Sequence, residues 1–464
     1  MSSFSGLSTA LSGLRVHQYA MDVVANNIAN AATPGYHRQE AVIVPGLVLT
    51  GAFGIAGTGI PQLGTGATVD TVRRMRSSYI DDQVRAAGNW LGEWNYRNEA
   101  LKQVESVLSE PGDLGLSSML DKFWNSWEEL SASPESLTAR TNVVETGVSL
   151  AQRFRSMYSD LREMQAGTDR DIVDNAEQVN RLAHEIAKIN EEIRPGPAGD
   201  YQPNDLLDRR DVLIDELSRI ARVQVSGAGG TDLIVSIGGK VLVQGNQVTE
   251  IVVSNGPNGW SQLTWADNGS SVVLSGGELA GQLDTRDYAL QGYIDSLNTV
   301  ASALVDRVNA LHSTGQLADG SPAGSFFVPG TDASNIKVEA SLVSSPSGVA
   351  TSTTGKPGDN ALALAISAVR DEILIGGETI GGAYSGLVAR IGANARQAES
   401  RVDTHTASLA QLDNQRESVS GVSLDEEMAN MVRFQQAYNA SARVFTVIDE
   451  MIDTVVSRMG ISGR

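Results

Sequence analysis

Histidines and paired carboxylates are the side chains of this chain that could perform acid-base or metal chemistry. His184-Glu185 lacks the second histidine that a zinc-protease helix requires. The adjacent carboxylates of Asp81-Asp82 diverge by about 100° on a helix, which is typical of a solvated surface. We therefore predict no catalytic residue and no metal site, since the five histidines also lie far apart in sequence: His17, His37, His184, His312 and His405.

Two glycine-rich stretches, residues 54–59 and 227–230, are the candidates for a phosphate cradle. A nucleotide loop needs a preceding strand, a following helix and commonly a Lys-Ser or Lys-Thr pair. Neither stretch lies in such a unit, and Lys240 is followed by Val241. The sequence therefore predicts no cofactor.

The amino-acid composition and net charge limit the classes of partner that the chain can bind. The chain has 464 residues, no cysteine, and 35 basic against 55 acidic side chains, a net charge of −20. The absence of cysteine excludes disulfides and thiol chemistry. The negative net charge disfavours electrostatic binding to nucleic acid or to an anionic membrane over a broad surface. No apolar run approaches the roughly 18 residues that span a bilayer. The first residues lack the basic start and apolar core of a secretory signal, so we expect another route if the protein leaves the cell.

The elements that must position any functional surface begin at the two chain ends. Apolar residues recur there in alternating steps of four and three, which places them along one stripe of a helix. The N-terminal stripe comprises Leu7, Leu11, Leu14, Gln18, Met21, Ala25 and Ile28. The C-terminal stripe comprises Leu424, Met428, Met431, Gln435, Tyr438, Ala442, Phe445, Asp449, Ile452, Val456 and Met459.

Each stripe has a sequence signal that limits its helix, a stop signal for the first and a start signal for the second. Thr33-Pro34-Gly35 ends the first helix, because proline lacks an amide hydrogen and disfavours helix in the residue before it. Ser423 and Glu426 form a capping box that starts the second helix. A five-residue step from Val419 to Leu424 breaks the heptad phase, and we place a joint at Gly421.

An apolar stripe needs a partner. Ordering a residue costs about 1 to 2 kcal/mol, and a side chain recovers that only when something covers it. We expect the terminal helices to pair with each other and with neighbouring copies, and residues 1–30 and 424–464 to be mobile in the isolated monomer. An intramolecular hairpin is the alternative. The predicted assembly residues are Leu7, Leu11, Leu14, Met21, Ile28, Leu424, Met428, Met431, Tyr438, Phe445, Ile452 and Val456.

The middle of the chain changes period twice. Residues 89–220 read as long helices with a core that includes Trp90, Trp94 and Trp127, residues 222–274 alternate as an antiparallel β region, and helical spacing returns over 285–312 and from Leu387. Residues 313–384 are rich in Gly, Ser and Thr, which is typical of an inserted domain.

The predicted fold is mainly α with a smaller β part. It combines terminal coiled-coil helices, a long-helix bundle with an antiparallel β region, and a small inserted outer domain. The expected domains are a terminal assembly unit (1–85 and 421–464), a helical middle domain (86–312 and 385–420, with β region 222–283) and the insert (313–384).

A family resemblance rests on motifs at both ends. The N-terminal motif resembles the signature of the bacterial flagellar axial proteins, which form the rod, hook and hook-associated family, and comprises Asn26, Asn27, Asn30, Pro34, Gly35, Tyr36, Arg38 and Gln39. Phe434-Gln435-Gln436-Ala437-Tyr438 resembles the C-terminal helix of that family. Residues 73–85 and 204–211 are most similar to its hook-filament junction members, although His37 and Ser77 depart from the family pattern.

The resemblance implies a structural role without enzyme activity. It implies type III export, assembly on the extracellular flagellum between hook and filament, and self-association in a ring or helical assembly. The implied partners are the hook protein, the second junction protein and an export chaperone on the C-terminal helix. Two alternatives stay open: another axial protein, such as the second junction protein or a hook subunit, and an enzyme or adhesin that carries its active part in residues 313–384.

Overall fold

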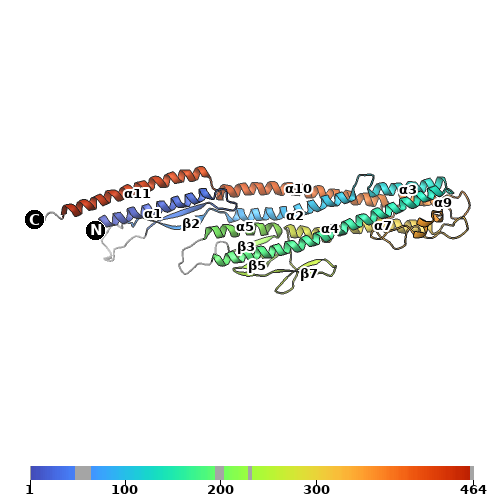
Figure 1. Ribbon diagram of the computed structural model, residues 1–464, viewed down its shortest axis with the longest axis horizontal. Helices are drawn as coiled ribbons and strands as arrows, with labels where there is room; N and C mark the ends of the chain where they lie inside the picture. Colours follow the sequence, from blue (N-terminus) through green and yellow to red (C-terminus); the bar gives the residue numbers. More distant parts are fainter. Residues whose placement is uncertain (1, 47–63, 194–202, 228–231, 460–464) are drawn as a thin grey trace.

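The chain is elongated, and both termini lie at the same end (Figure 1). The computed structural model describes residues 2–46, 64–193, 203–227 and 232–459. Helices dominate and small antiparallel sheets accompany them, so the predicted fold class is confirmed. None of the described helices combines the length and apolarity needed to cross a membrane. The longest helices are α1 (Ser2–Ala29), α2 (Ser78–Leu108), α4 (Leu137–Glu192), α10 (Ile380–Ser420) and α11 (Leu424–Met459).

One end of the molecule is built from α1, α11 and a β-hairpin. Strands β1 (Gln39–Pro45) and β2 (Ala67–Arg74) pair antiparallel beside α1. The chain leaves α10 at Ser420 and enters α11 at Leu424, so the helix break predicted at Gly421 is present.

Five further helical segments run along the elongated body of the molecule outside α1, α11 and the β1–β2 pair, here called the rod. They are α3 (Leu116–Ala132), α5 (Asn204–Ile220), α6 (Glu278–Asp284), the π-helical η1 (Thr285–Leu290) and α7 (Gln291–His312). Helix α2 is continuous through residues 85 and 86, so the domain boundary expected there falls inside a helix.

The β region covers one flank of α4 and α5 (Figure 1). Strands β3 (Val223–Ser226), β4 (Ile234–Ile237), β5 (Lys240–Gln244) and β6 (Gln247–Val248) form a four-stranded antiparallel sheet, and β7 (Ile251–Asn255) pairs with β8 (Ser261–Trp265). Alternate residues such as Val235 and Ile237 point into a core shared with Ile186, Ile214 and Leu217. The alternation in the sequence therefore reflects a half-buried sheet.

Residues 313–384 share the core of the rod's far end. Phe326 packs on Phe123 and Trp127, with ring centroids 5.8 and 5.4 Å apart. Buried His312 accepts the Ala350 amide hydrogen at Nε2. The segment, which includes α8 (Ala340–Ser344), η2 (Pro346–Gly348), α9 (Ala361–Ser367) and η3 (Ala368–Asp371), joins one hydrophobic core with α3, α4 and α7. It is therefore not a separate outer unit, because its aromatic side chains insert between those helices.

The two tryptophans at the start of the helical region are not core residues as predicted, since Trp90 is exposed and Trp94 is half-buried. Trp90 is 38% exposed and stacks on His405. Trp94 lies within cation-π distance of the guanidinium groups of Arg97 and Arg401. Helix α2 faces α10 at this level, and a two-helix contact leaves one side of each ring in solvent.

Phe326→Ala tests whether residues 313–384 belong to the common core. We expect it to lower the free energy of unfolding by about 3 to 5 kcal/mol, since the ring is fully buried. Urea unfolding followed by the fluorescence of the tryptophans in α3 reports the change. Leu364→Ala, at a side chain that is 55% exposed, is the control and should change little. Unfolding of α3 at the wild-type urea midpoint would contradict the shared core.

Candidate assembly interface

Helices α1 and α11 form an antiparallel pair, here called the terminal hairpin. Position along one helix rises as position along the other falls, through contacts of Gly6 with Ile448, Gly13 with Ser441, His17 with Phe434 and Asn27 with Glu427. The pairing of the two terminal helices with each other, which both interpretations from sequence share, is therefore present.

The stripe of α1 that faces α11 lies one residue before the predicted one. It keeps the same steps of four and three but comprises Gly6, Ala10, Gly13, His17, Ala20, Val24 and Asn27. The predicted residues Leu7, Leu14, Met21 and Ile28 are half-buried at the side of the pair, and Leu11 is exposed. The larger apolar side chains of α1 are thus left available beside the contact.

Small residues explain this offset. A Cβ at Gly13 would lie 3.0 Å from Ser441 Oγ, and one at Gly6 would lie 3.2 Å from Ile448 Cδ1. Small side chains at a helix contact let the two backbones approach closely, and dispersion contacts increase with that approach. A stripe of leucines would hold the helices further apart.

Helix α11 carries apolar residues on more than one side. Met431, Tyr438, Phe445 and Ile452 are half-buried at the α1 contact, as members of the predicted stripe. Other apolar side chains are about half exposed or more: Leu424, Met428, Val432, Val444, Val447, Met451, Val455 and Val456. This width of apolar surface exceeds what one partner helix covers.

Asn27, from the family motif, links α1 to the start of α11 and to the turn that follows α1. Its amide donates to the Gln39 carbonyl oxygen at 2.9 Å and to Glu427 at 3.0 Å. Its carbonyl accepts from the Gln39 amide at 2.9 Å and from the Tyr36 hydroxyl at 2.8 Å. Asn27 and Glu427 are both buried, so every hydrogen-bonding position of this amide is used away from water.

The rest of the motif shapes the turn after α1. Asn30 donates to Asn26. Gly35 has a φ of +77°, and a Cβ there would lie 2.2 Å from Val212 of α5. Glycine is required because both the backbone and the neighbouring helix exclude a side chain. Pro34 is exposed on this turn.

Arg38 connects three segments. Its amide donates to the Ser420 carbonyl oxygen at 2.8 Å, its carbonyl accepts from the Met75 amide, and its Nε donates to Glu427 at 2.8 Å. The end of α10, the end of β2 and the start of α11 are therefore fixed to one residue.

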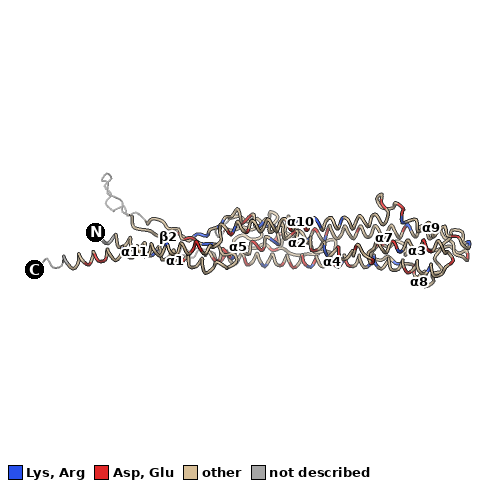
Figure 2. The backbone as a smooth tube through the Cα atoms, turned by 90° about the horizontal axis from the view of Figure 1, so that it is seen from above, with Lys and Arg blue, Asp and Glu red and all other residues tan. Residues whose placement is uncertain are grey.

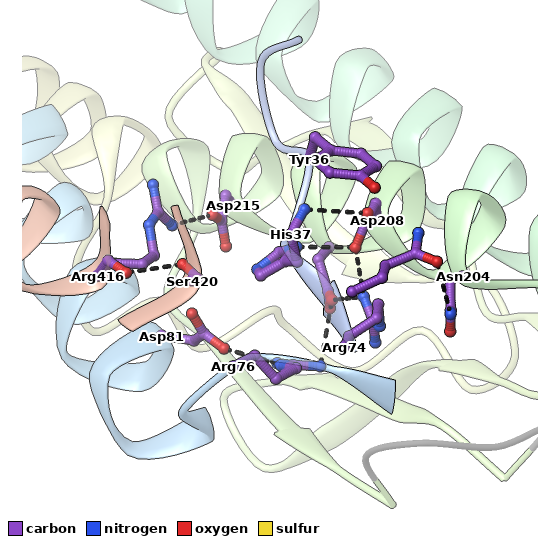
Figure 3. Close-up of polar contacts among 12 residues, drawn as sticks. Tyr36, His37, Arg74, Arg76, Asp81, Asn204, Asp208, Asp215, Arg416 and Ser420 are labelled. Atoms are coloured by element: carbon purple, nitrogen blue, oxygen red, sulfur yellow. Dashed lines mark hydrogen bonds and ion pairs between the residues drawn. The ribbon is translucent and has the colours of Figure 1, made fainter. Parts of the chain in front are cut away.

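Three aspartates on one face of α5 meet four arginines from other elements. Figure 3 labels two of the aspartates, Asp208 and Asp215, and three of the arginines, Arg74, Arg76 and Arg416. Asp208 and Asp211 each lie 2.8 Å from Arg74 Nη1, and Asp211 also contacts Arg76 and Arg85. Asp215 pairs with Arg85 and Arg416, both at 2.7 Å. We call this network, together with Asn27, Arg38 and Glu427, the joint, because it fixes the terminal hairpin to α2, α5 and α10.

Charge and burial set the protonation of the joint. Burial raises the pKa of Asp211, but Arg76, Arg74 and Arg85 together hold that pKa below its usual value. Burial, with the negative charges of Asp208 and Glu427, raises the pKa of Tyr36 to about 12. Asp211 is thus ionised at neutral pH, and Tyr36 stays a neutral hydrogen-bond donor.

A cluster with metal-like spacing lies within the joint. Ligand atoms of His37, Asp208 and Asp211 all lie within 4.8 Å of one another, and His37 Nδ1 is 2.7 Å from Asp208. Arg74 donates to both carboxylates, so a guanidinium already supplies the positive charge at this position. The arrangement is that of an ion-pair network.

Sequence reasoning found the family-motif residues Asn27 and Arg38 of the joint, but not the ion pairs between the aspartates of α5 and the arginines of other elements. His37 and Asp208 are 171 residues apart, and Arg416 is 201 residues from Asp215. A signal was present: the aspartates at 208, 211 and 215 share one helical face, and Arg73-Arg74-Met75-Arg76 is a basic run.

Gly13→Leu tests the close approach of α1 and α11. We expect the added side chain to displace Ser441 and separate the helices, raising hydrogen exchange of α1 amides in the monomer by roughly tenfold or more. Gly292→Leu is the matched control, since a Cβ at this helical glycine meets nothing within 4 Å. Unchanged protection of α1 in Gly13→Leu would show that the contact is not tight.

Asp211→Asn tests the joint. Its stabilising effect is complete above the unfolded carboxyl pKa of about 3.9 and is lost as pH falls through the lower pKa of the folded chain. We expect the variant to lose about 3 kcal/mol of unfolding free energy near neutral pH and to approach the wild type as the pH falls through the lowered pKa of Asp211 in the folded chain. Urea unfolding over a series of pH values measures this. The exposed Asp205→Asn, on the same helix, should match the wild type throughout, and a pH-independent loss in Asp211→Asn would contradict the ion-pair account.

Three family models match the chain. "Flagella basal body rod protein" matches residues 7–37, "Flagellar hook-associated protein FlgK helical domain" matches residues 101–327, and "Flagellar basal body rod FlgEFG protein C-terminal" matches residues 414–459. The two terminal matches cover most of the terminal hairpin and the turn that enters the joint. The central match covers much of the rod.

Whole-chain relatives agree with these matches. The chain is 32% identical to flagellar hook-associated protein 1 of Bacillus subtilis over the full length of both, and 26% identical to that of Salmonella typhimurium over 97% of this chain and 99% of the relative. A solved structure of the flagellar hook junction protein FlgK from Burkholderia pseudomallei shares the fold, with a TM-score of 0.65 at 16% identity, over 73% of this chain and all of that one. This chain therefore belongs to the flagellar hook-associated protein 1 family.

Proposed function

We propose that this chain is a structural adaptor that joins the flagellar hook to the filament and assembles through the apolar surface of its terminal hairpin. The observation that carries the proposal is the apolar surface left exposed on α11. Met428, Val432 and Val444 are each more than half exposed on a helix whose inner side is already covered by α1. Exposed apolar area of this extent is typical of a protein-protein interface.

The predicted assembly residues fall into a group that holds the hairpin together, a group that faces other subunits, and a set at the edge between them. Met431, Tyr438, Phe445 and Ile452 hold the hairpin together from α11. Leu11, Leu424, Met428 and Val456 are exposed and face other subunits. Leu7, Leu14, Met21 and Ile28 lie between these groups, at the edge of the hairpin. Both groups are needed, because an interface must be presented by a helix pair that keeps its shape.

We divide the chain for this role at its helix boundaries. The terminal assembly unit comprises residues 1–77 and 421–464, and an elongated unit comprises 78–420 with 313–384 as its far end. The start of α2 at Ser78 and the break at Gly421 support these limits. The joint holds the two units in a fixed relation, so a load on the elongated unit reaches the hairpin through buried ion pairs.

The partners in this proposal are sister copies, the hook protein and the second junction protein, outside the cell after type III export. An export chaperone on α11 would cover its exposed apolar residues before assembly. The apolar surface supports such a partner, since it would otherwise promote aggregation.

We propose no catalytic role. The relatives are structural flagellar proteins, and residues 313–384, the alternative location for an active part, contain no histidine. Their aromatic side chains serve the core of the rod instead.

Met428→Asp tests the assembly surface without disturbing the hairpin contact. We expect hooks without filaments, because a charge buried between subunits would have no partner. Electron microscopy of flagella and circular dichroism of the purified chain measure attachment and folding. Leu364→Asp is the control, since its side chain is 55% exposed against 54% for Met428 but lies on the elongated unit. Normal filaments in Met428→Asp would count against this surface.

A further inference from the structure

The end of α11 extends beyond its partner helix. Gly6 lies opposite Ile448, and Ser2, the first residue of α1, is four residues earlier, so α1 ends opposite Ile452. Helix α11 continues to Met459, and residues 453–457 are all exposed. The last two turns therefore have no cover from the part of the chain that the structure describes.

This overhang carries a defined mixture of side chains. Asp449, just before the overhang, and Asp453 and Val456 within it recur at steps of four and three on one helical face, here called the tip surface. Val456 is 69% exposed. Among the described residues, neither aspartate has a basic side chain within ion-pairing distance. The tip surface is thus an exposed apolar side chain flanked by unpaired negative charge.

A cavity of about 360 Å³ lies at the other end of the same hairpin, where α1, β1 and α11 meet. Val23, Val42, Ile43 and Phe434 supply the apolar part of its lining. The charged part includes two ion pairs, Arg38 with Glu427 and Arg73 with Glu40. Arg433 also lines it, with the guanidinium 4.9 Å from the Phe434 ring centroid and no described carboxylate within ion-pairing distance. We call this lining the cup surface.

We propose that the tip surface of one copy docks in the cup surface of a sister copy. The match is chemical: Val456 meets the apolar lining, and Asp449 or Asp453 meets Arg433. A charge-assisted pair at such a contact gives register as well as attraction. This inference rests on the proposed function and names which surfaces of the hairpin mate.

The positions of the two surfaces determine the type of assembly. Phe434 and Val456 are 22 residues apart on one straight helix, about 33 Å at 1.5 Å per residue, so a chain cannot dock with itself. The contact is heterologous, and it places each copy displaced along the hairpin axis from the next. Such contacts close into rings or extend as helices.

Cysteine cross-linking tests this pairing directly, because the natural chain contains no cysteine. The double variant Ile43→Cys with Val456→Cys is expressed as the sole copy in flagellated cells, and isolated flagella are treated with a bismaleimide much shorter than the separation within one chain. We expect covalent oligomers of this chain. Asn430→Cys, another cup residue on α11, replaces Ile43→Cys in a second variant in case the change in β1 disturbs the strand.

Three results would overturn the inference. They are dimers from Val456→Cys alone, which indicate tip-to-tip contact, a cross-link to a different flagellar protein, and filaments of normal yield without the oligomer in either variant. Val456→Cys with Tyr288→Cys, at an exposed side chain of the elongated unit, is the control and should give no oligomer. Filaments without the oligomer leave the proposed function standing, whereas normal filaments in cells that lack this chain overturn the function itself.

A charge exchange provides an independent measurement. Arg433→Glu should reduce filament attachment, and adding Asp453→Arg should restore much of it, since the pair is formed again in reverse. Arg443→Glu, at an exposed arginine elsewhere on α11, should leave attachment unchanged. A double variant that performs no better than Arg433→Glu would contradict the contact.

Discussion

The close packing of α1 against α11 through small side chains is the constraint on which the rest of the assembly end depends. Glycines at positions 6 and 13 bring the backbones together, and this leaves leucines, methionines and valines at the sides of the pair. If the larger residues formed the contact, the hairpin would bury most of its apolar surface internally, and little would be left exposed for a neighbouring subunit. The same choice of stripe therefore holds the monomer together and leaves apolar area for other subunits.

Such a hairpin would be a poor structural element if it could swing freely. The joint prevents this with polar contacts from seven separate segments, centred on Asn27, Arg38, Glu427 and the aspartates of α5. Hydrogen bonds and ion pairs depend on direction and distance more strongly than apolar contacts do. A buried network thus specifies one orientation, even where its net contribution to stability is modest. The charge distribution along the chain shows acidic and basic residues gathered at this position (Figure 2).

The far end of the rod is held together chiefly by apolar packing. Residues 313–384 contain few long helices, yet Phe326 and Phe327 place them in a continuous apolar core with α3, α4 and α7. A segment that looks independent by composition is held by aromatic packing. Residues 313–384 and the helices at this end therefore share one hydrophobic core.

The sequence alone determined the helices of both ends, the start of the second after Ser423, the break at Gly421, the antiparallel β region and the mainly α fold, because period and capping are local properties. The first helix ends at Ala29, four residues before the predicted stop at Thr33. The sequence also indicated the family through a motif whose residues Asn27, Tyr36 and Gln39 are hydrogen-bonded to one another on the hairpin side of the joint. It could not determine which stripe of α1 faces α11, since two stripes offset by one residue have the same period and only the fit between two backbones selects the smaller side chains. It could not pair His37 with Asp208 or Arg416 with Asp215 either, because these contacts join residues more than 150 positions apart and exist only once the helices are packed.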